Sequence, residues 1–205
     1  MRRTKEAALE TRAKILESAL DIFSEKNFSN ASLTEIAANV GLTKGALYWH
    51  FRNKNDLLLR LFEEICRHGE DRVKNLFDAP DSSGKLRRYY KNSLARLLKD
   101  DRNKKIHKIM TKRDEWPEDI QQSVSQIIKD SMEQEKLMVK NFVRKGQEEG
   151  RLRKDISAEA LAVLISSIFH GLCVMQLSGM LPKEFPQYTD ILFDAFEKEL
   201  NIKQQ

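Results

Sequence analysis

The sequence predicts an all-α protein, with a small three-helix domain at its N-terminus and a larger helical domain behind it, about nine helices in all. Apolar residues recur at intervals of three and four along most of the chain, which is the period of a helix with one buried face. Only 8 glycines and 4 prolines interrupt the 205 residues, too few for the many turns of an all-β protein. The same composition excludes collagen-like and low-complexity chains.

The first helix is predicted over residues 7–26. Its apolar residues include Ile15, Leu16, Leu20 and Phe23, which share one face at helical spacing. The charged residues that open the chain are not followed by an apolar segment of the kind found in secretory signals. We therefore expect a cytoplasmic protein.

Two short helices follow, separated by a tight turn. Ser32 and Glu35 form a Ser-x-x-Glu capping box, in which each side chain can satisfy a backbone N–H group near the start of the second helix. Gly41 suits the left-handed residue that ends this helix, and Thr43 can cap a third helix over residues 44–50. Two helices joined in this way predict a helix-turn-helix. The alternative is an ordinary helical hairpin with a surface lysine and core aromatic residues.

The rest of the chain is predicted to form longer helices. Residues 53–56 supply caps for a fourth helix that ends near Asp78, and residues 80–84 form the clearest linker. The last helix should follow a turn between Leu181 and Pro186. Beyond the linker, helices are expected over residues 84–99, 102–114, 118–148, 157–179 and 188–200.

Three runs of residues carry a family likeness: Ser-Leu-Thr-Glu-Ile-Ala at 32–37, Val-Gly-Leu-Thr-Lys-Gly-Ala-Leu-Tyr-Trp-His-Phe at 40–51, and Lys-Asn-Asp-Leu at 54–57. With the first helix, they make the N-terminal part resemble the DNA-binding domain of the TetR family of one-component repressors. The Tyr-Trp-His-Phe variant is most similar to the AcrR-type subgroup, which represses multidrug efflux pumps. That subgroup often has arginine where Lys44 stands, so this chain departs from the subgroup at a residue expected to read the bases.

The resemblance implies roles for individual residues of the helix-turn-helix. Lys44 and Gly45 would read base edges in the major groove, which is about 12 Å wide. Lys54, at the start of the fourth helix, would clamp a phosphate. Trp49 has two interpretations, because its indole N–H can donate to phosphate and its ring can equally pack in the domain. The other expected phosphate contacts are Ser32, Thr34, Thr43, Tyr48 and His50.

By the same resemblance, residues 1–56 bind DNA, and residues 57–205 bind an effector and a second subunit. Aromatic residues, methionines and a few polar groups on these later helices suit an adaptable apolar pocket, although residues of these types can equally form the core. The candidates for the effector pocket are Phe62, Ile65, Cys66, Met110, Trp116, Ile127, Met132, Phe169, Cys173 and Gln176.

Two charged segments bear on the chemistry of the effector. The subgroup resemblance implies an acidic residue near position 114, where a buried carboxylate can pair with a cationic drug. Asp114 and Glu115 both fit, and a solvated helix end is the alternative. Residues 85–113 contain 12 basic and 2 acidic residues, which could attract DNA or an anionic effector such as a fatty-acyl compound. They could equally form a solvated face, balanced by the acidic residues that follow.

Residues 160–182 contain no Asp, Glu, Lys or Arg and are long enough to span a membrane. Ser166, His170 and Gln176 interrupt the run, so we expect a helix buried between protein surfaces and no membrane association. Paired with the last helix, it suits a four-helix interface in a homodimer, which would read a palindromic operator in double-stranded DNA. The expected interface residues are Leu161, Leu164, Ile168, Leu172, Leu192 and Phe196.

The sequence contains no recognisable catalytic motif. It has no glycine-rich phosphate loop, no Gly-x-Ser-x-Gly motif and no cysteines and histidines at metal-ligand spacing. Cys66 and Cys173 lie far apart, as in a protein of the reducing cytosol. We expect no enzyme, no cofactor and no metal. Two alternatives are a TetR-type regulator without a small-molecule ligand and a helical binding module whose helix-turn-helix is only structural.

Overall fold

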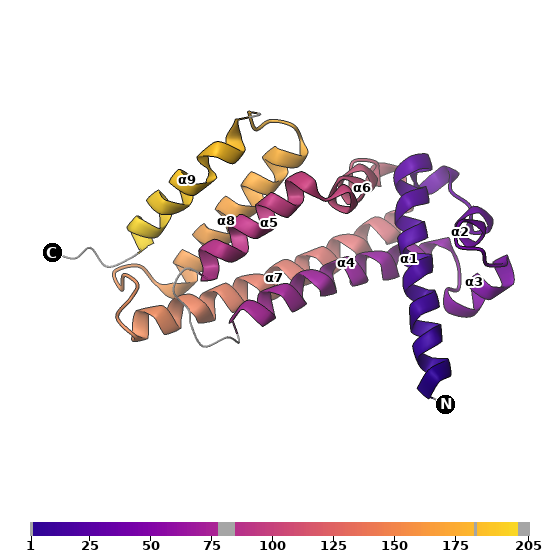
Figure 1. Cartoon of the computed structure of the whole chain (residues 1–205), viewed down its shortest axis with the longest axis horizontal. Helices are drawn as coiled ribbons and strands as arrows, with labels where there is room; N and C mark the ends of the chain where they lie inside the picture. Colours follow the sequence, from indigo (N-terminus) through magenta and orange to yellow (C-terminus); the bar gives the residue numbers. More distant parts are fainter. Residues whose placement is uncertain (1, 78–84, 183, 201–205) are drawn as a thin grey trace. The chain divides into compact units, whose positions relative to one another are not determined.

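The computed structural model describes the backbone of residues 2–77, 85–182 and 184–200, which contain nine α-helices, one 3-10 turn and no β-strand (Figure 1). The predicted all-α fold is confirmed, whereas the predicted linker at residues 80–84 lies outside these ranges. The helices are α1 (Arg2–Asn30), α2 (Leu33–Asn39), α3 (Lys44–His50), α4 (Lys54–Phe77), α5 (Lys85–Lys99), α6 (Asp101–Met110), α7 (Glu118–Glu148), α8 (Ala158–Leu177) and α9 (Phe185–Leu200).

The chain forms two compact units, each built from two segments. Unit 1 consists of Met1–Arg67 and Asp101–Lys129, and unit 2 consists of His68–Asp100 and Asp130–Gln205. Helices α4 and α7 therefore contribute to both units. The bounds of these units differ from the predicted division at residue 56. That division separates the expected DNA-binding part from the expected effector-binding part, and it stays a prediction.

The core of unit 1 joins the first three helices to the start of α4. Ile15, Leu20 and Phe23 of α1 are fully buried, as are Leu47 of α3 and Leu57 of α4. Helix α1 packs on both α2 and α6. The apolar face predicted for the first helix is therefore the face that organises the unit.

A buried serine connects α1 to α2. The Ser18 hydroxyl donates to the carbonyl of Ile36 over 2.9 Å and accepts from the side-chain amide of Asn39 over 3.0 Å. Ser18 is only 2% exposed, so these two hydrogen bonds replace the water that its hydroxyl loses on folding.

The end of α1 differs from the prediction. Helical residues continue to Asn30, but Asn27 adopts a left-handed φ of 65° and produces a kink. Asparagine is among the few residues that tolerate this region. The kink places Phe28 in the core, where its ring centroid lies 5.5 Å from that of Phe23 and 6.4 Å from that of Trp116.

Two further boundaries differ from the prediction. Helix α6 ends at Met110 and gives way to a 3-10 turn over Arg113–Glu115, instead of continuing to residue 114 as predicted. Trp116 is extended, as expected of a residue that precedes a proline. Helix α9 begins at Phe185, earlier than predicted, because Pro186 fits the first helical turn, where no backbone donor is needed.

Unit 2 has a separate core, in which α5 packs on α8 and α9. Its buried residues include Tyr90, Val139, Val143, Leu161 and Ile165. Three of the helices that form it, α5, α8 and α9, lie side by side in Figure 1.

Candidate nucleic-acid interface and effector site

Helices α2 and α3 both begin at local caps that the sequence predicted. The Ser32 hydroxyl accepts from the backbone N–H of Glu35, and the Glu35 carboxylate accepts from the N–H of Ser32 over 3.1 Å, so the capping box of α2 is formed. The Lys26 ammonium and the Ser32 groups together lower the pKa of Glu35 to about 2. The Thr43 hydroxyl accepts from the N–H of Ala46 at the start of α3. Both helices of the motif therefore begin at fixed points.

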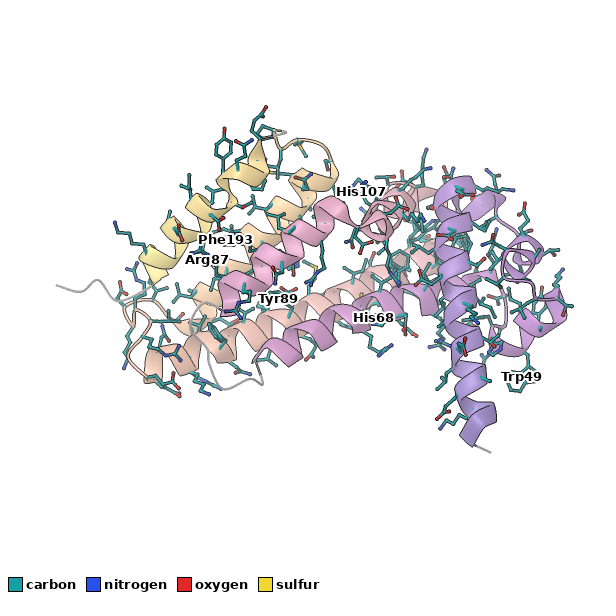
Figure 2. All side chains as sticks on the ribbon, in the orientation of Figure 1. Trp49, His68, Arg87, Tyr89, His107 and Phe193 are labelled. Carbon is teal, nitrogen blue, oxygen red and sulfur yellow. The ribbon has the colours of Figure 1, made fainter. Side chains whose placement is uncertain are left out.

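The outer side of α3 is exposed in unit 1. Leu47 is fully buried, whereas Tyr48 is 47% exposed and Trp49 is 80% exposed. Figure 2 shows the Trp49 side chain projecting away from the ribbon. Packing inside the domain, one of the two interpretations of Trp49, therefore does not apply in the free protein. Lys44 lies over the Tyr48 ring, with its Nζ atom 5.8 Å from the ring centroid.

Gly45 lies in the first turn of α3 with open space around it. A Cβ atom at this position would meet the Thr43 hydroxyl at 3.9 Å and nothing closer. Folding of this unit therefore does not require a glycine here. A bare backbone at the start of the second motif helix instead suits close approach to a ligand surface.

Lys54 has partners that the sequence did not predict. Its ammonium donates to the backbone carbonyls of Phe28, Ser29 and Ala31 over 2.7, 3.1 and 3.0 Å. It also lies 4.6 Å from the centroid of the Phe28 ring, and burial lowers its pKa. The three donors of the ammonium are thus directed at the end of α1, whereas the resemblance implies a phosphate contact.

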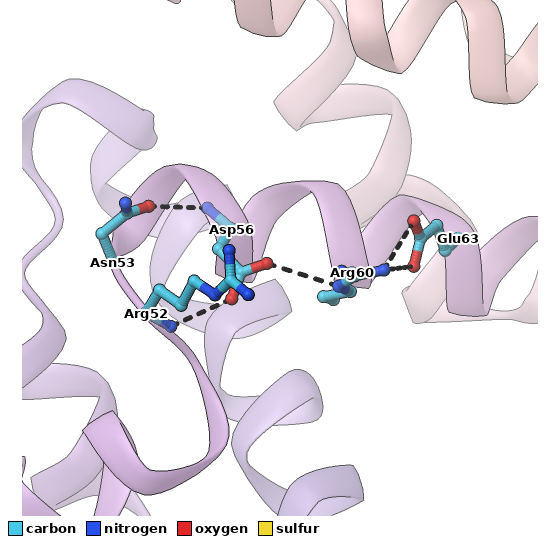
Figure 3. A network of polar contacts seen from close by, with 5 residues as sticks. All are labelled: Arg52, Asn53, Asp56, Arg60 and Glu63. Atoms are coloured by element: carbon cyan, nitrogen blue, oxygen red, sulfur yellow. Dashed lines mark hydrogen bonds and ion pairs between the residues drawn. The ribbon is translucent and has the colours of Figure 1, made fainter.

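The start of α4 is capped as predicted (Figure 3). The Asn53 side chain accepts from the N–H of Asp56 over 2.8 Å, and the Asp56 carboxylate accepts from the N–H of Arg52 over 2.9 Å. Arg60 then contacts both Asp56 and Glu63 on the next turn. These contacts fix the first two turns of the helix that carries Lys54.

The other expected DNA contacts occupy the same small region. Thr34, at the start of α2, is exposed, and His50, at the end of α3, is partly exposed. The His50 ring lies between its neighbours, with its centroid 5.4 Å from Trp49 and 6.4 Å from Phe51. The hydroxyl of Ser32 donates to the Glu35 carboxylate over 2.9 Å, so its proton is already used in the cap.

The predicted effector residues are divided between the two units. In unit 1, Phe62 and Trp116 are buried, and Ile65, Met110 and Ile127 are partly buried against the same core. Phe62 and Trp116 contact each other, with ring centroids 5.7 Å apart. The indole N–H of Trp116 has no hydrogen-bond partner among the described residues. Cys66 is partly buried.

The expectation of a buried carboxylate at position 114 or 115 is wrong. Asp114 and Glu115 are both exposed in the 3-10 turn, and Glu115 lies 3.8 Å from Lys112. The turn brings the chain back to the surface before Pro117, so the alternative of a solvated helix end describes these residues better.

Unit 2 contains a buried carboxylate that the sequence analysis missed. Glu135 of α7 lies 3.5 Å from the imidazole Nε2 of His170 on α8, and only 14% of its side chain is exposed. Glu135 is one of many acidic residues on a long amphipathic helix, so no sequence signal separates it from its exposed neighbours. Of the predicted pocket residues in this unit, Phe169, Cys173 and Gln176 are partly buried, whereas Met132 is 43% exposed.

A cavity of about 390 Å³ lies between α5, α8 and α9. Its lining is almost wholly apolar, and Phe193 of α9, labelled in Figure 2, contributes to it. Three residues expected at a subunit interface also line it: Ile168, Leu172 and Leu192.

Helix α8 exposes much of its apolar surface in the single chain. Leu164 and Ile168 are 46% and 41% exposed, and Ile191 and Leu192 of α9 are exposed as well. Leu161 is wrongly predicted as an interface residue, because it is 1% exposed and belongs to the core of unit 2. The Phe196 side chain lies outside the described part of the chain. By length and composition α8 could cross a membrane, although core helices of soluble proteins pass the same test.

The basic segment 85–113 is partly neutralised inside each unit. In unit 2, Arg87 and Lys91 lie 3.2 and 2.5 Å from the carboxylate of Asp190. In unit 1, Lys105 lies 3.0 Å from Asp21. These pairs favour a solvated, balanced face over a dedicated anion site. No cluster of potential metal ligands occurs among the described residues.

Comparison with known proteins gives a consistent picture. Residues 15–61 match the model of bacterial regulatory proteins of the tetR family. The chain is 31% identical over 199 residues to the HTH-type transcriptional regulator TtgR of Pseudomonas putida, and the alignment covers 95% of each chain.

Two similar folds come from efflux regulators. The crystal structure of NalD, the secondary repressor of the MexAB-OprM multidrug efflux pump in Pseudomonas aeruginosa, matches with a TM-score of 0.73 at 22% identity and covers 95% of this chain and 98% of its own. The SmeT–triclosan complex matches with a TM-score of 0.77 at 22% identity and covers 95% and 93%. Together with the capped helix-turn-helix, the full-length similarity shows that this chain is a DNA-binding transcriptional regulator of the TetR family.

Proposed function

We propose that the protein is a cytoplasmic repressor that binds a palindromic operator as a homodimer and releases it when a small hydrophobic effector binds. The observation that carries this proposal is helix α3. It is anchored by the buried Leu47 and by the Thr43 cap, and it presents Lys44, Tyr48 and Trp49 outward. A helix of this kind enters the major groove and reads base edges with its first residues.

Within this helix, Lys44 and Gly45 read the bases. Lysine is a common reader of guanine, through its O6 and N7 atoms. The open space around Gly45 supports the assignment, because the bare backbone can approach the DNA closely. Tyr48, His50, Thr34 and Thr43 contact the phosphates on either side.

The dimer forms through α8 and α9. An apolar surface that includes Leu164, Ile168, Ile191 and Leu192 is exposed in the single chain, and a soluble protein of this size normally covers such a surface. A two-fold interface would place two copies of α3 about 34–36 Å apart, one turn of DNA. Helix α8 is as apolar as a helix that crosses a membrane. Its burial in the dimer interface explains how a cytoplasmic protein can contain such a helix.

The controlled genes encode a multidrug efflux system. NalD and SmeT support this assignment, since NalD is the secondary repressor of the MexAB-OprM multidrug efflux pump and SmeT is the repressor of the SmeDEF multidrug efflux pump. The paired state of Arg87, Lys91 and Lys105 counts against an anionic effector. The protein is a regulator without enzymatic activity or a cofactor.

The test is binding to the DNA upstream of its own gene, measured by fluorescence anisotropy at physiological salt against a scrambled duplex. We expect two chains per duplex and tight binding to the native segment alone. Lys44→Ala should lose about 1–3 kcal/mol of the discrimination between the two duplexes. If Lys44→Ala loses the same affinity for both duplexes, the assignment of Lys44 to base contacts is wrong. Weak and equal binding of the two duplexes by the wild type would contradict the proposed repression at this DNA.

A further inference from the structure

The positively charged side chains of α1 to α4 fall into two groups among the described residues. One group is paired within the chain, with carboxylates or with backbone carbonyls: Lys14, Lys26, Lys54, Arg60 and Arg67. The other group has neither a side-chain hydrogen bond nor an ion pair in the part of the chain that the structure describes: Lys5, Arg12, Lys44 and Arg52. The second group keeps its N–H donors available to an outside partner.

Two of these available cations lie at the C-terminal end of α3. Phe51 is the C-cap of this helix, and Arg52 follows it directly and is exposed. Arg12 comes from α1, and its Cζ atom lies over the Phe51 ring, 5.3 Å from the centroid. Phe51 is only 1% exposed, so its ring is fixed in the core and holds the guanidinium beside the last turn of α3.

The contact with Phe51 orients Arg12 without a hydrogen bond. It arises from attraction between the positive charge and the face of the ring. The five N–H donors of the guanidinium therefore stay free for a ligand. A side chain that is already held in place loses less conformational entropy on binding, and the planar guanidinium matches the oxygens of a phosphate. Arg12 is thus preorganised for a phosphate group.

The ring under Arg12 belongs to a row of rings that leads to the exposed side of α3. The His50 centroid lies 6.4 Å from that of Phe51 and 5.4 Å from that of Trp49. Trp49 projects away from the ribbon in Figure 2. His50 and Trp49 are residues expected to contact DNA, so Arg12 lies next to the expected DNA contacts, although it is on another helix.

The length of α3 brings this end of the helix close to a phosphate backbone. Helix α3 has 7 residues, which span about 10 Å at about 1.5 Å per residue. The major groove is about 12 Å wide, and phosphates border it on both sides. When Lys44 in the first turn reaches the base edges, the last turn lies near the groove wall.

We propose that Arg12 and Arg52 bind backbone phosphates of the DNA at the C-terminal end of α3. This inference rests on the proposed function, because it adds two residues to the DNA contacts of that proposal. Phosphate contacts carry no sequence information, so the two arginines supply affinity for any duplex and fix the position of α3. Lys44 then discriminates between sequences.

The experiment measures how DNA affinity falls with salt. The full-length protein is titrated by fluorescence anisotropy onto the native and the scrambled duplex, between about 50 and 200 mM salt. Each phosphate contact contributes about 0.9 to the slope of log K against log salt. Arg12→Gln and Arg52→Gln should each flatten the slope by about one unit on both duplexes. The affinity lost over this fourfold salt range should then shrink by about 3.5-fold in each variant. An unchanged slope in either variant overturns the assignment of that residue.

Two further variants separate a phosphate contact from other roles of these arginines. Lys14→Gln removes a cation of α1 that is paired with Glu10 over 2.7 Å, and it should leave the slope unchanged. If Lys14→Gln flattens the slope as much as Arg12→Gln, general loss of charge explains the effect and the proposal is overturned. Arg12→Lys keeps the charge, so it should keep the slope and weaken binding through loss of the planar guanidinium. A purely structural role of Arg12 would lower the affinity of Arg12→Gln without flattening its slope.

The two duplexes also separate this inference from the proposed function. Tight binding of the native duplex alone, with flattened slopes in the variants, supports both. Tight binding of the native duplex with unchanged slopes overturns the phosphate contacts and leaves the repressor function standing. Equal binding of both duplexes, with flattened slopes, contradicts repression at this DNA and leaves the phosphate contacts standing. A wild type that binds neither duplex contradicts both.

Discussion

The helix-turn-helix region and the interior of unit 2 treat buried polar groups in opposite ways. In α1 to α3, the buried Ser18 and the partly buried Lys54 ammonium each have two or three hydrogen bonds to neighbouring helices. Between α5, α7 and α8, three buried polar atoms, on Tyr90, Glu135 and Ser166, have none among the described residues. Polar groups that are paired within the chain fix how its helices pack, whereas unpaired ones leave hydrogen-bonding capacity unused.

Lys54 is the strongest test of the paired region. Lys54→Met should destabilise the protein by about 2–3 kcal/mol, because the carbonyls of Phe28, Ser29 and Ala31 lose a charged donor at the end of a helix. Urea unfolding measures this loss. Lys129→Met, which removes an exposed charge of the same unit, is the control and should change stability little.

The salt dependence of DNA binding then separates two roles of Lys54. A lysine that positions the end of α1 affects affinity but leaves the slope of log K against log salt unchanged. A lysine that clamps a phosphate, as the resemblance implies, flattens the slope by about one unit when it is removed. A flattened slope for Lys54→Met would show that the Lys54 ammonium contacts a phosphate when DNA binds.

Ser32 tests the paired region at a single cap. Ser32→Ala should cost about 1 kcal/mol of folding free energy, because the capping box of α2 loses its acceptor. Glu35→Gln should cost less, since glutamine can still close the capping box and only the exposed pair with Lys26 is lost. Thermal unfolding of the two variants checks the order, and a larger loss in Glu35→Gln would contradict it.

Local signals explain how far the sequence could predict these two regions. The caps at Ser32, Thr43 and Asn53 are short patterns with one physical solution, and the structure forms all of them. The kink at Asn27 and the three carbonyls around Lys54 depend on how the end of α1 meets α4, which no local pattern encodes.

The contact between Glu135 and His170 was harder to predict for the same reason. Glu135 and His170 belong to different helices, and each looks ordinary within its own. Subgroup resemblance placed the buried carboxylate at position 114 or 115, where the chain instead returns to the surface before Pro117. A buried polar cluster is defined by which helices pack together, so it becomes visible only in the folded chain.

The pair of Glu135 and His170 should make stability depend on pH. The contact raises the pKa of His170 above its unfolded value of about 6.5, so its stabilisation is complete below that pH and disappears as the pH rises through the folded pKa. We expect the stability difference between the wild type and His170→Gln to fall by roughly 0.5 kcal/mol on going from acidic to alkaline conditions. Urea unfolding between about pH 5.5 and 8.5 measures it, and a difference that grows with pH would refute the pairing.

Two serines provide the most direct test of the contrast. Ser18 and Ser166 are both buried in helices. Among the described residues, the Ser18 hydroxyl both donates and accepts a hydrogen bond, whereas the Ser166 hydroxyl does neither. Ser18→Ala should therefore cost about 1–2 kcal/mol, whereas Ser166→Ala should change stability by less than about 0.5 kcal/mol, because no hydrogen bond of its hydroxyl is lost. Unfolding of both variants without added ligand measures the two values. A loss at Ser166 as large as that at Ser18 would mean that an ordered water or a bound compound already pairs with this hydroxyl, and the interior of unit 2 would then be as fully satisfied as the helix-turn-helix.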